Sequence, residues 1–256
     1  MRQILKFYLI AFLSFNLYSF PAIDTNDRFL INCFNILSDS NLLGFQANSY
    51  PLNIAKVDKA LKEIELSKLN DYQLAAYNCL NKFVKDSLKK TRTEVEINTG
   101  SPDFSLNTLF NDNRFSDYFY IKQQFNGKNF SINIENYSVD ENGTKNFLDN
   151  SYISYVNGNT IYSIGNKTLW WSPSNDNSLV ISNNPRTPFG LYIQNKNSIK
   201  FNRKIINKLG SLDYAFFIRK LESSRHIPNA KLFGLRLSFY PADNFNFSVF
   251  RTAQWG

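Results

Sequence analysis

Residues 232–251 read LFGLRLSFYPADNFNFSVFR, and this stretch decides the fold. Leu235, Leu237 and Phe239 are separated by single residues that include Arg236 and Ser238. Phe245, Phe247 and Val249 repeat the pattern a few residues later. A period of two is the period of a β-strand, because successive side chains of a strand point to opposite faces. The stretch therefore predicts two neighbouring strands, each with one apolar and one polar face.

The same period begins well before this stretch. Phe130, Ile132 and Ile134 alternate with polar residues, and three dipeptides typical of tight hairpin turns separate such segments: Asn126-Gly127, Asn142-Gly143 and Asn157-Gly158. We expect eight to ten strands between Phe115 and Arg251. Strands of about ten residues are typical of outer-membrane barrels, although a soluble β-sandwich would show the same alternation. Apolar faces rich in Phe and Tyr favour the barrel, so the predicted fold class is mainly β, an antiparallel outer-membrane β-barrel.

The region from Asp24 to Lys90 has a different period. Its apolar residues recur at the three- and four-residue spacing of amphipathic helices, in three groups that start near Leu30, Ile54 and Leu74. Asn70 and Gln73 resemble a capping box at the start of the third group. We therefore predict a small three-helix bundle over residues 23–98, in the periplasm, followed by the barrel portion over residues 99–256.

Residues 1–22 have the layout of a secretory signal peptide. Arg2 and Lys6 precede a mostly apolar stretch from Leu9 to Leu17, and a polar segment follows. A membrane anchor helix is the alternative, but a span needs about 20 apolar residues. Later in the chain no stretch reaches the roughly 18 apolar residues of a membrane helix. Entry into a membrane would then require a closed sheet, since lipid leaves no partners for open backbone groups.

The remaining composition limits the chemistry. The net charge of +8 is compatible with nucleic-acid binding, but export from the cytoplasm argues against that partner. The single histidine, His226, supports no Ser/His/Asp set, and neither zinc-ligand spacing nor a glycine-rich phosphate loop occurs. We expect a non-enzymatic protein without cofactor or metal. The two cysteines, Cys33 and Cys79, form a disulfide or remain separate buried thiols.

Two longer motifs resemble those of the Wzi family of capsule assembly proteins. Residues 169–191, LWWSPSNDNSLVISNNPRTPFGL, resemble a family element in which a Trp-Trp-Gly-Pro-like group precedes a strand and an Arg-Pro-type turn, with Ser172 here in place of the usual Gly. Residues 232–256 resemble the family's strand pair that closes on Arg-Thr-Ala-Gln-Trp-Gly. Residues 28–43 and 49–64 are similar to its amino-terminal helices.

The resemblance implies an outer-membrane, lectin-like β-barrel that binds capsular or other extracellular polysaccharide and helps to assemble it at the cell surface. Members continue beyond the position of Gly256, so we expect this chain to represent the first part of a larger barrel. We expect a monomer in contact with outer-membrane lipid. A porin-like channel and a soluble exported glycan-binding sandwich are the alternatives. The identity and charge of the polysaccharide stay open.

The tryptophan pair defines the candidate site. Neighbouring side chains of a strand point to opposite faces, so Trp170 and Trp171 would direct one ring to lipid and the other to the barrel interior. Either a saccharide contact or a packed polar cluster inside the barrel would result. The residues expected to share the interior site are Trp170, Trp171, Asn183, Asn184 and Arg186, joined by Arg251, Gln254 and Trp255 from the end of the chain.

Overall fold

The structure is a computed structural model. It describes residues 22–23, 28–45, 47, 49–87, 89–99, 117–140, 144–174, 177–178, 180–181, 185–201, 206–242 and 245–256. The expected signal peptide therefore lies outside the described residues, except for Ala22. Asn183 and Asn184 also lie outside them.

Three α-helices form the first part of the structure: α2 (Arg28–Asp39), α3 (Ile54–Glu63) and α4 (Asp71–Ser87), with the 3-10 helix η1 (Leu66–Lys68) before α4. The Asn53 side chain caps α3 by accepting a hydrogen bond from the Ala55 amide at 2.9 Å. At α4 the Asn70 and Gln73 side chains accept hydrogen bonds from each other's amides, which confirms the predicted capping box. Within the described part of the chain, no helix combines the length and apolar character needed to cross a membrane.

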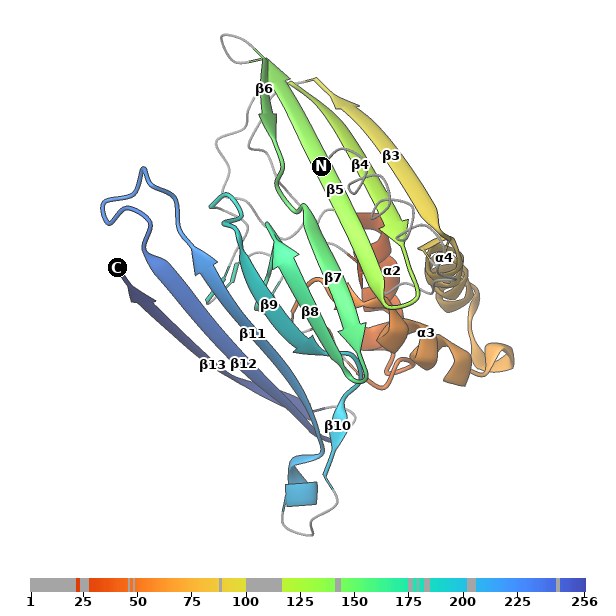
Figure 1. The fold of residues 1–256 in the computed structure, drawn as a ribbon. Helices are drawn as coiled ribbons and strands as arrows, with labels where there is room; N and C mark the ends of the chain where they lie inside the picture. Colours follow the sequence, from red (N-terminus) through yellow and green to blue (C-terminus); the bar gives the residue numbers. More distant parts are fainter. Residues whose placement is uncertain are drawn as a thin grey trace, which may run out of the picture.

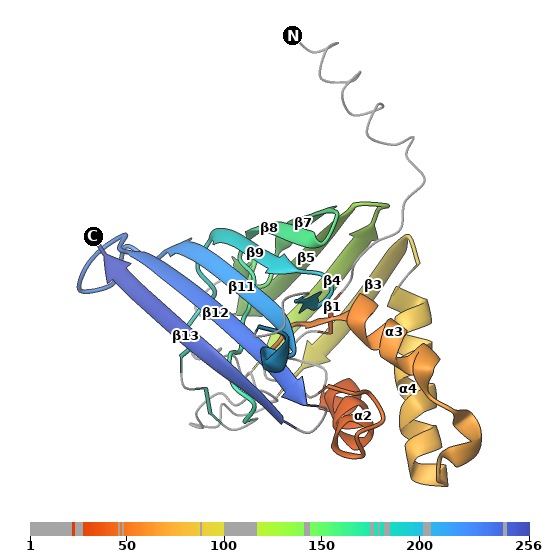
Figure 2. The same ribbon diagram turned by 90° about the horizontal axis from the view of Figure 1, so that it is seen from below.

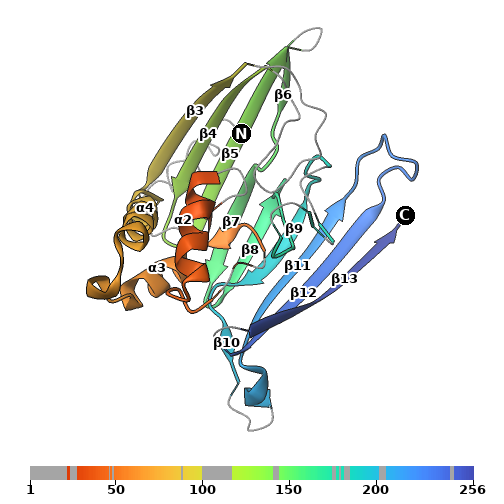
Figure 3. The same cartoon turned by 180° about the vertical axis from the view of Figure 1, so that it is seen from behind.

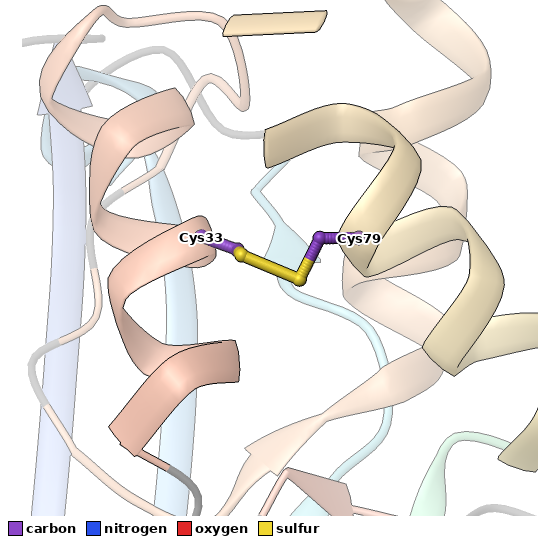
Figure 4. The surroundings of a disulfide bond; sticks show 2 residues. All are labelled: Cys33 and Cys79. Atoms are coloured by element: carbon purple, nitrogen blue, oxygen red, sulfur yellow. A yellow bond between two sulfur atoms is a disulfide. The ribbon is translucent and has the colours of Figure 1, made fainter. Parts of the chain in front are cut away.

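The helices share one apolar core. Phe34, Leu37, Val57 and Leu80 are fully buried in it, because each lies on the apolar stripe of its helix. A disulfide joins Cys33 on α2 to Cys79 on α4, and their Cα atoms lie 6.5 Å apart (Figure 4). That separation falls within the range that a disulfide requires. Of the two alternatives left open by the sequence, the disulfide is the one present, and it holds the first and third helices together.

The rest of the structure is one curved antiparallel sheet (Figures 1 and 2). Its strand order is β13-β12-β11-β9-β8-β7-β5-β4-β3, with β6 paired to β5 and β10 paired to β11. The strands are β3 (Thr91–Asn98), β4 (Tyr118–Asn126), β5 (Phe130–Asp140), β6 (Thr144–Phe147), β7 (Tyr152–Asn157), β8 (Thr160–Gly165), β9 (Gly190–Asn195), β10 (Ile199–Lys200), β11 (Ser211–Lys220), β12 (Lys231–Ala242) and β13 (Phe245–Trp255). A short 3-10 helix, η2 (Ile206–Leu209), precedes β11. Ten of these eleven strands, β4 to β13, begin after Phe115, so the predictions of antiparallel pairing and of eight to ten strands in that region are confirmed.

The boundary between the two parts differs from the expected one. β3 pairs with β4 along its whole length, so the sheet begins at Thr91 rather than at residue 99. The first four residues of β3, Thr-Arg-Thr-Glu, are all polar, so only Val95 and Ile97 show the apolar alternation that marks the other strands. Two further strands of two residues each, β1 (Ala22–Ile23) and β2 (Leu52–Asn53), pair with each other among the helices.

The outer face of the sheet is apolar and exposed. One row of directly paired side chains crosses six strands from β7 to β13 without a polar residue: Ile153, Ile164, Leu191, Ile218, Phe233 and Ala253. A soluble protein rarely exposes so continuous an apolar surface. The surface is therefore suited to an apolar surrounding.

The inner face carries the opposite chemistry. Glu135 on β5 is 1% exposed and accepts hydrogen bonds from the Asn133 and Asn150 side chains, both at 2.8 Å. Ser154 and Ser163 share a hydrogen bond of 2.7 Å between β7 and β8. Polar residues are thus buried inside and apolar residues exposed outside, the reverse of a soluble sheet and the arrangement of a barrel in lipid.

The helices lie against one end of the strands, as Figures 1 and 3 show. Lys56 of α3 donates a 2.8 Å hydrogen bond to Asp213 at the start of β11. Asn126, at the end of β4, donates to the Ser87 carbonyl that ends α4. The tight turns at Gly127 and Gly158 lie at this same end, whereas the long connection 166–189 between β8 and β9 starts at the other.

Candidate functional site

The connection between β8 and β9 folds into the concave side of the sheet. Trp170 pairs with Tyr50 as an antiparallel bridge, with N–O distances of 2.8 and 3.0 Å. The indole of Trp170 is fully buried in the helical core, and its Nε1 donates to the Ser174 carbonyl at 2.8 Å. This segment is therefore part of the interior packing rather than a strand of the wall.

Trp171 is buried in a second core. It is 2% exposed and its ring centroid lies 5.2 Å from that of Phe217 on β11 and 6.1 Å from that of Phe250 on β13. The guanidinium of Arg236 lies 5.7 Å from the same ring. The expectation that one tryptophan faces lipid is wrong, because the segment leaves the sheet after Gly165 and both faces of its backbone meet protein.

A cleft of about 160 Å³ lies beside this second core. It is at the end of the strands opposite the helices, since it is lined from the last residues of β11, the first of β12 and the end of β13. Arg219 is six residues beyond Asp213 along β11, which corresponds to roughly 20 Å at the rise of a strand. The lining residues are Thr168, Leu169, Val180, Ile181, Pro185, Arg186, Thr187, Pro188, Arg219, Leu221, Arg225, Leu232 and Gln254.

Two of the three arginines that line the cleft have acidic partners. Arg186 donates two hydrogen bonds to Asp149, at 3.2 and 3.3 Å, and its guanidinium lies 3.9 Å from the centroid of the Phe147 ring. Arg225 is paired with Glu222. Partial burial opposes ionisation of Glu222, but the hydrogen bond and charge of Arg225 lower the pKa of this carboxyl below its usual value.

Arg219 is held differently. It is 6% exposed, and its guanidinium lies 4.4 Å from the Phe217 ring centroid and 5.2 Å from that of Tyr192. One Nη donates to the Lys167 carbonyl at 3.3 Å, while the buried Nε lacks an acceptor among the described residues. Its charge is therefore stabilised by aromatic rings, the Tyr192 side chain and one carbonyl rather than by a carboxylate.

The three predicted site residues at the end of the chain, Arg251, Gln254 and Trp255, do not lie together. Gln254 lines the cleft. Arg251 pairs with Leu235 in the outer-face register, and Trp255 is 46% exposed on that same face. The expectation of a shared interior cluster is wrong for Arg251 and Trp255, because residues an odd number of positions from Gln254 in one strand point to the opposite face.

The structure thus brings Arg186 and Gln254 of the predicted set to one cleft, beside the core that holds Trp171. Sequence reasoning missed Arg219 and Arg225. The signal for Arg219 is present in the sequence, since it follows Ala215 and Phe217 at a spacing of two and so shares their inner face. In the described ranges, no group of three His, Cys, Asp or Glu side chains is arranged to hold a metal ion.

Comparison with known proteins gives a family and a relative. The family model described as "Capsule assembly protein Wzi" matches residues 107–256. An uncharacterized 55.8 kDa protein in the cps region of Klebsiella pneumoniae is 23% identical over 232 residues, which cover 90% of this chain and 46% of that protein.

A solved structure has the same fold. It is Wzi of Escherichia coli, described as an outer-membrane protein involved in group 1 capsule assembly and as a carbohydrate-binding β-barrel. The TM-score is 0.75 at 19% identity, over 92% of this chain and 54% of that one. This chain spans about half the length of the relatives it matches. The likeness confirms the predicted fold class, an antiparallel barrel portion with helices at its start.

Proposed function

The chain belongs to the capsule assembly protein Wzi family, and from this premise we propose that it is an outer-membrane protein that binds capsular or other extracellular polysaccharide and helps to assemble or attach it at the cell surface. The proposed role is binding without cleavage of the polysaccharide. The observation that carries it is the cleft lined by Arg186, Arg219, Arg225 and Gln254 at the end of the strands opposite the helices.

The outer face supports insertion in a membrane. A row of exposed or half-buried apolar side chains from Ile153 to Ala253 crosses six paired strands, whereas the inner face buries polar residues such as Glu135. In water such an exposed surface would promote association, but in lipid it contacts acyl chains. This favours a membrane barrel over a soluble sandwich.

The ends of the strands support an orientation. Barrels of the outer membrane have short turns in the periplasm and longer loops outside. The hairpin turns at Gly127 and Gly158 lie at the end that the helices contact, and the long connection from Asn166 starts at the other end. We therefore assign the helices to the periplasm and the cleft to the outer side of the membrane, where a surface polysaccharide would reach it.

The cleft has the chemistry that a saccharide requires. Guanidinium groups and the Gln254 amide can bind hydroxyl and carboxylate oxygens, while Val180 and Leu232 supply an apolar wall for a ring face. The inner face beside it is filled by Trp171, Phe217 and Phe250. This filling supports binding rather than conduction of solutes.

The test is polysaccharide binding by purified protein in detergent, together with cell fractionation. We expect Arg186→Ala to reduce the binding of capsular polysaccharide from the producing strain, and the matched change Arg251→Ala, on the outer face, to leave it intact. Equal binding by both variants would remove the cleft as the site. Sugar fragments released during incubation would show catalysis, and steady single-channel conductance would favour a porin.

A further inference from the structure

We propose that the cleft is an anion site in which Arg219 binds the carboxylate of an acidic saccharide. This inference rests on the proposed function and names the class of sugar. It starts from the three arginines that line the cleft, among which Asp and Glu are absent within the described residues.

The charge of Arg219 is costly where it lies. Moving a cation out of water is strongly unfavourable unless partners replace the water. Arg186 and Arg225 have such partners in Asp149 and Glu222. In the described part of the chain the contacts of Arg219 are the Lys167 carbonyl, the Tyr192 side chain and the Phe217 ring, and none of them is a carboxylate. A protein that keeps a buried arginine in this setting gains from an anion that reaches it.

The geometry fits a planar oxoanion. The Nε of Arg219 is buried without an acceptor among the described residues, and one Nη is engaged by Lys167. Each Nη carries two N–H groups, so the end-on edge formed by the two Nη atoms can donate to both oxygens of a carboxylate. The guanidinium lies over the rings of Tyr192 and Phe217, and Arg219 lines the cleft from which the ligand approaches this edge.

The rest of the cleft suits one sugar ring. Thr168 and Thr187, whose hydroxyl oxygens lie 3.1 Å apart, and Gln254 can bind ring hydroxyls. Ile181 and Leu221 are apolar lining residues. The volume of about 160 Å³ is below the roughly 300–1,000 Å³ of sites for drug-sized ligands. A single uronic acid residue of a longer chain is therefore the ligand that matches both the size and the charge.

The experiment compares three probes on the detergent-purified protein by isothermal titration calorimetry. They are a uronic acid oligosaccharide, its methyl ester, and inorganic phosphate. We expect the acid to bind at least tenfold more tightly than the ester, because charge-assisted hydrogen bonds are the stronger ones, and its affinity to fall as salt rises. Equal affinity for acid and ester would overturn the proposal. Tighter binding of phosphate than of the acid would overturn the assignment to a saccharide carboxylate.

Variants locate the effect. Arg219→Met keeps a long apolar side chain against Phe217 and removes the charge, and loss of a buried charge of this kind is often tolerated. We expect it to abolish the preference for acid over ester, whereas Arg251→Met on the outer face retains it. A folded Arg219→Met protein that still prefers the acid would refute the site. If extracted capsular polysaccharide binds but the acid and ester bind equally, the proposed function stands and only this inference fails; if no saccharide binds, both fail.

Discussion

The backbones of Tyr50 and Trp170 pair with each other, 120 residues apart in the sequence, through two hydrogen bonds of 2.8 and 3.0 Å. This bridge brings the connection between β8 and β9 down to the helices. It also divides the tryptophan pair, since Trp170 packs in the core of the helices and Trp171 in the core of the sheet. Two adjacent side chains thus couple the two parts of the molecule.

The coupling predicts a large cost for Trp171→Ala. Removal of the indole would leave a cavity between Phe217 and Phe250, and truncation of a buried Trp typically costs about 3 to 5 kcal/mol. Urea unfolding in detergent, followed by tryptophan fluorescence and circular dichroism, measures the loss. Trp255→Ala on the exposed outer face is the control, and we expect a change several times smaller. Equal losses in the two variants would contradict the assignment of Trp171 to the core.

The ion pair between Lys56 and Asp213 should hold α3 to the sheet. The two groups are 2.8 Å apart and largely buried, and the Lys56 ammonium also lies 4.5 Å from the ring centroids of Phe45 and Tyr240. In a double-mutant cycle of Lys56→Met and Asp213→Asn, we expect a coupling energy of about 1 to 3 kcal/mol.

The matched control for this cycle is the exposed pair Lys62–Asp58, spaced i and i+4 on α3. Such pairs contribute about 0.3 to 0.5 kcal/mol. Limited proteolysis gives a second measure, because weaker docking of α3 in the Lys56 and Asp213 variants should let the protease cleave the helices before the strands. Similar coupling energies for the two pairs would mean that Lys56–Asp213 acts as an ordinary surface pair.

The disulfide should stabilise the helical part. Cys33 and Cys79 close a loop across 46 positions of sequence, and a bridge of this span stabilises by about 2 to 4 kcal/mol through restriction of the unfolded chain. We expect Cys33→Ser/Cys79→Ser to lower the free energy of unfolding by this amount. Reduction of the unmodified protein with a thiol should give the same shift. If neither treatment changes the unfolding midpoint, the bridge does not contribute.

Gly234 should not tolerate a side chain. It lies on the inner face of β12, where an added Cβ would come within 2.1 Å of the Phe217 ring. Overpacking of this kind typically costs about 1 to 3 kcal/mol, so we expect Gly234→Ala to lower the unfolding midpoint. The second change Phe217→Leu should recover part of the loss by making room. If the double variant loses more stability than the two single variants together, contact with the Phe217 ring is not the cause of the Gly234→Ala loss.

Local sequence patterns predicted the elements but not what covers them. The alternation around Leu235 and Phe245 and the helical spacing around Leu30 correspond to β12, β13 and α2. The inward course of Trp170 was not predictable, because it depends on a pairing with Tyr50 that no local period records. β3 was missed because its first four residues are all polar and only Val95 and Ile97 alternate with polar residues.

The candidate site shows the same limit. Arg186 and Gln254 line the cleft, whereas Arg251 and Trp255 were grouped with them by proximity in the sequence. In a strand, side chains an odd number of positions apart point to opposite faces, however close they are in the sequence. Even spacing along a strand places Gln254 on the same face as Phe250, and Arg219 on the same face as Phe217. That no described carboxylate lies beside Arg219 can be seen only in the three-dimensional structure.

Ile164→Lys tests whether the outer face lies in lipid. Ile164 is 43% exposed on the outer face of β8, one residue before the strand ends, and lies between Ile153 and Leu191 of the neighbouring strands. In water a lysine at so exposed a position would change stability little. In a bilayer a lysine near the midplane of a barrel costs about 2 to 4 kcal/mol, and near the interface only about 0 to 1.

We therefore expect Ile164→Lys to lower the free energy of unfolding in lipid vesicles by more than about 1 kcal/mol, with the midplane cost of about 2 to 4 kcal/mol as the upper range. The control is Asn157→Lys, which places the same charge at an exposed position where β7 ends. Its cost should be at most about 1 kcal/mol, because the ammonium can reach water at the strand end. Unfolding by urea from vesicles, monitored by tryptophan fluorescence, gives both values. Equal and small losses in the two variants would show that the apolar row faces water or another protein rather than lipid.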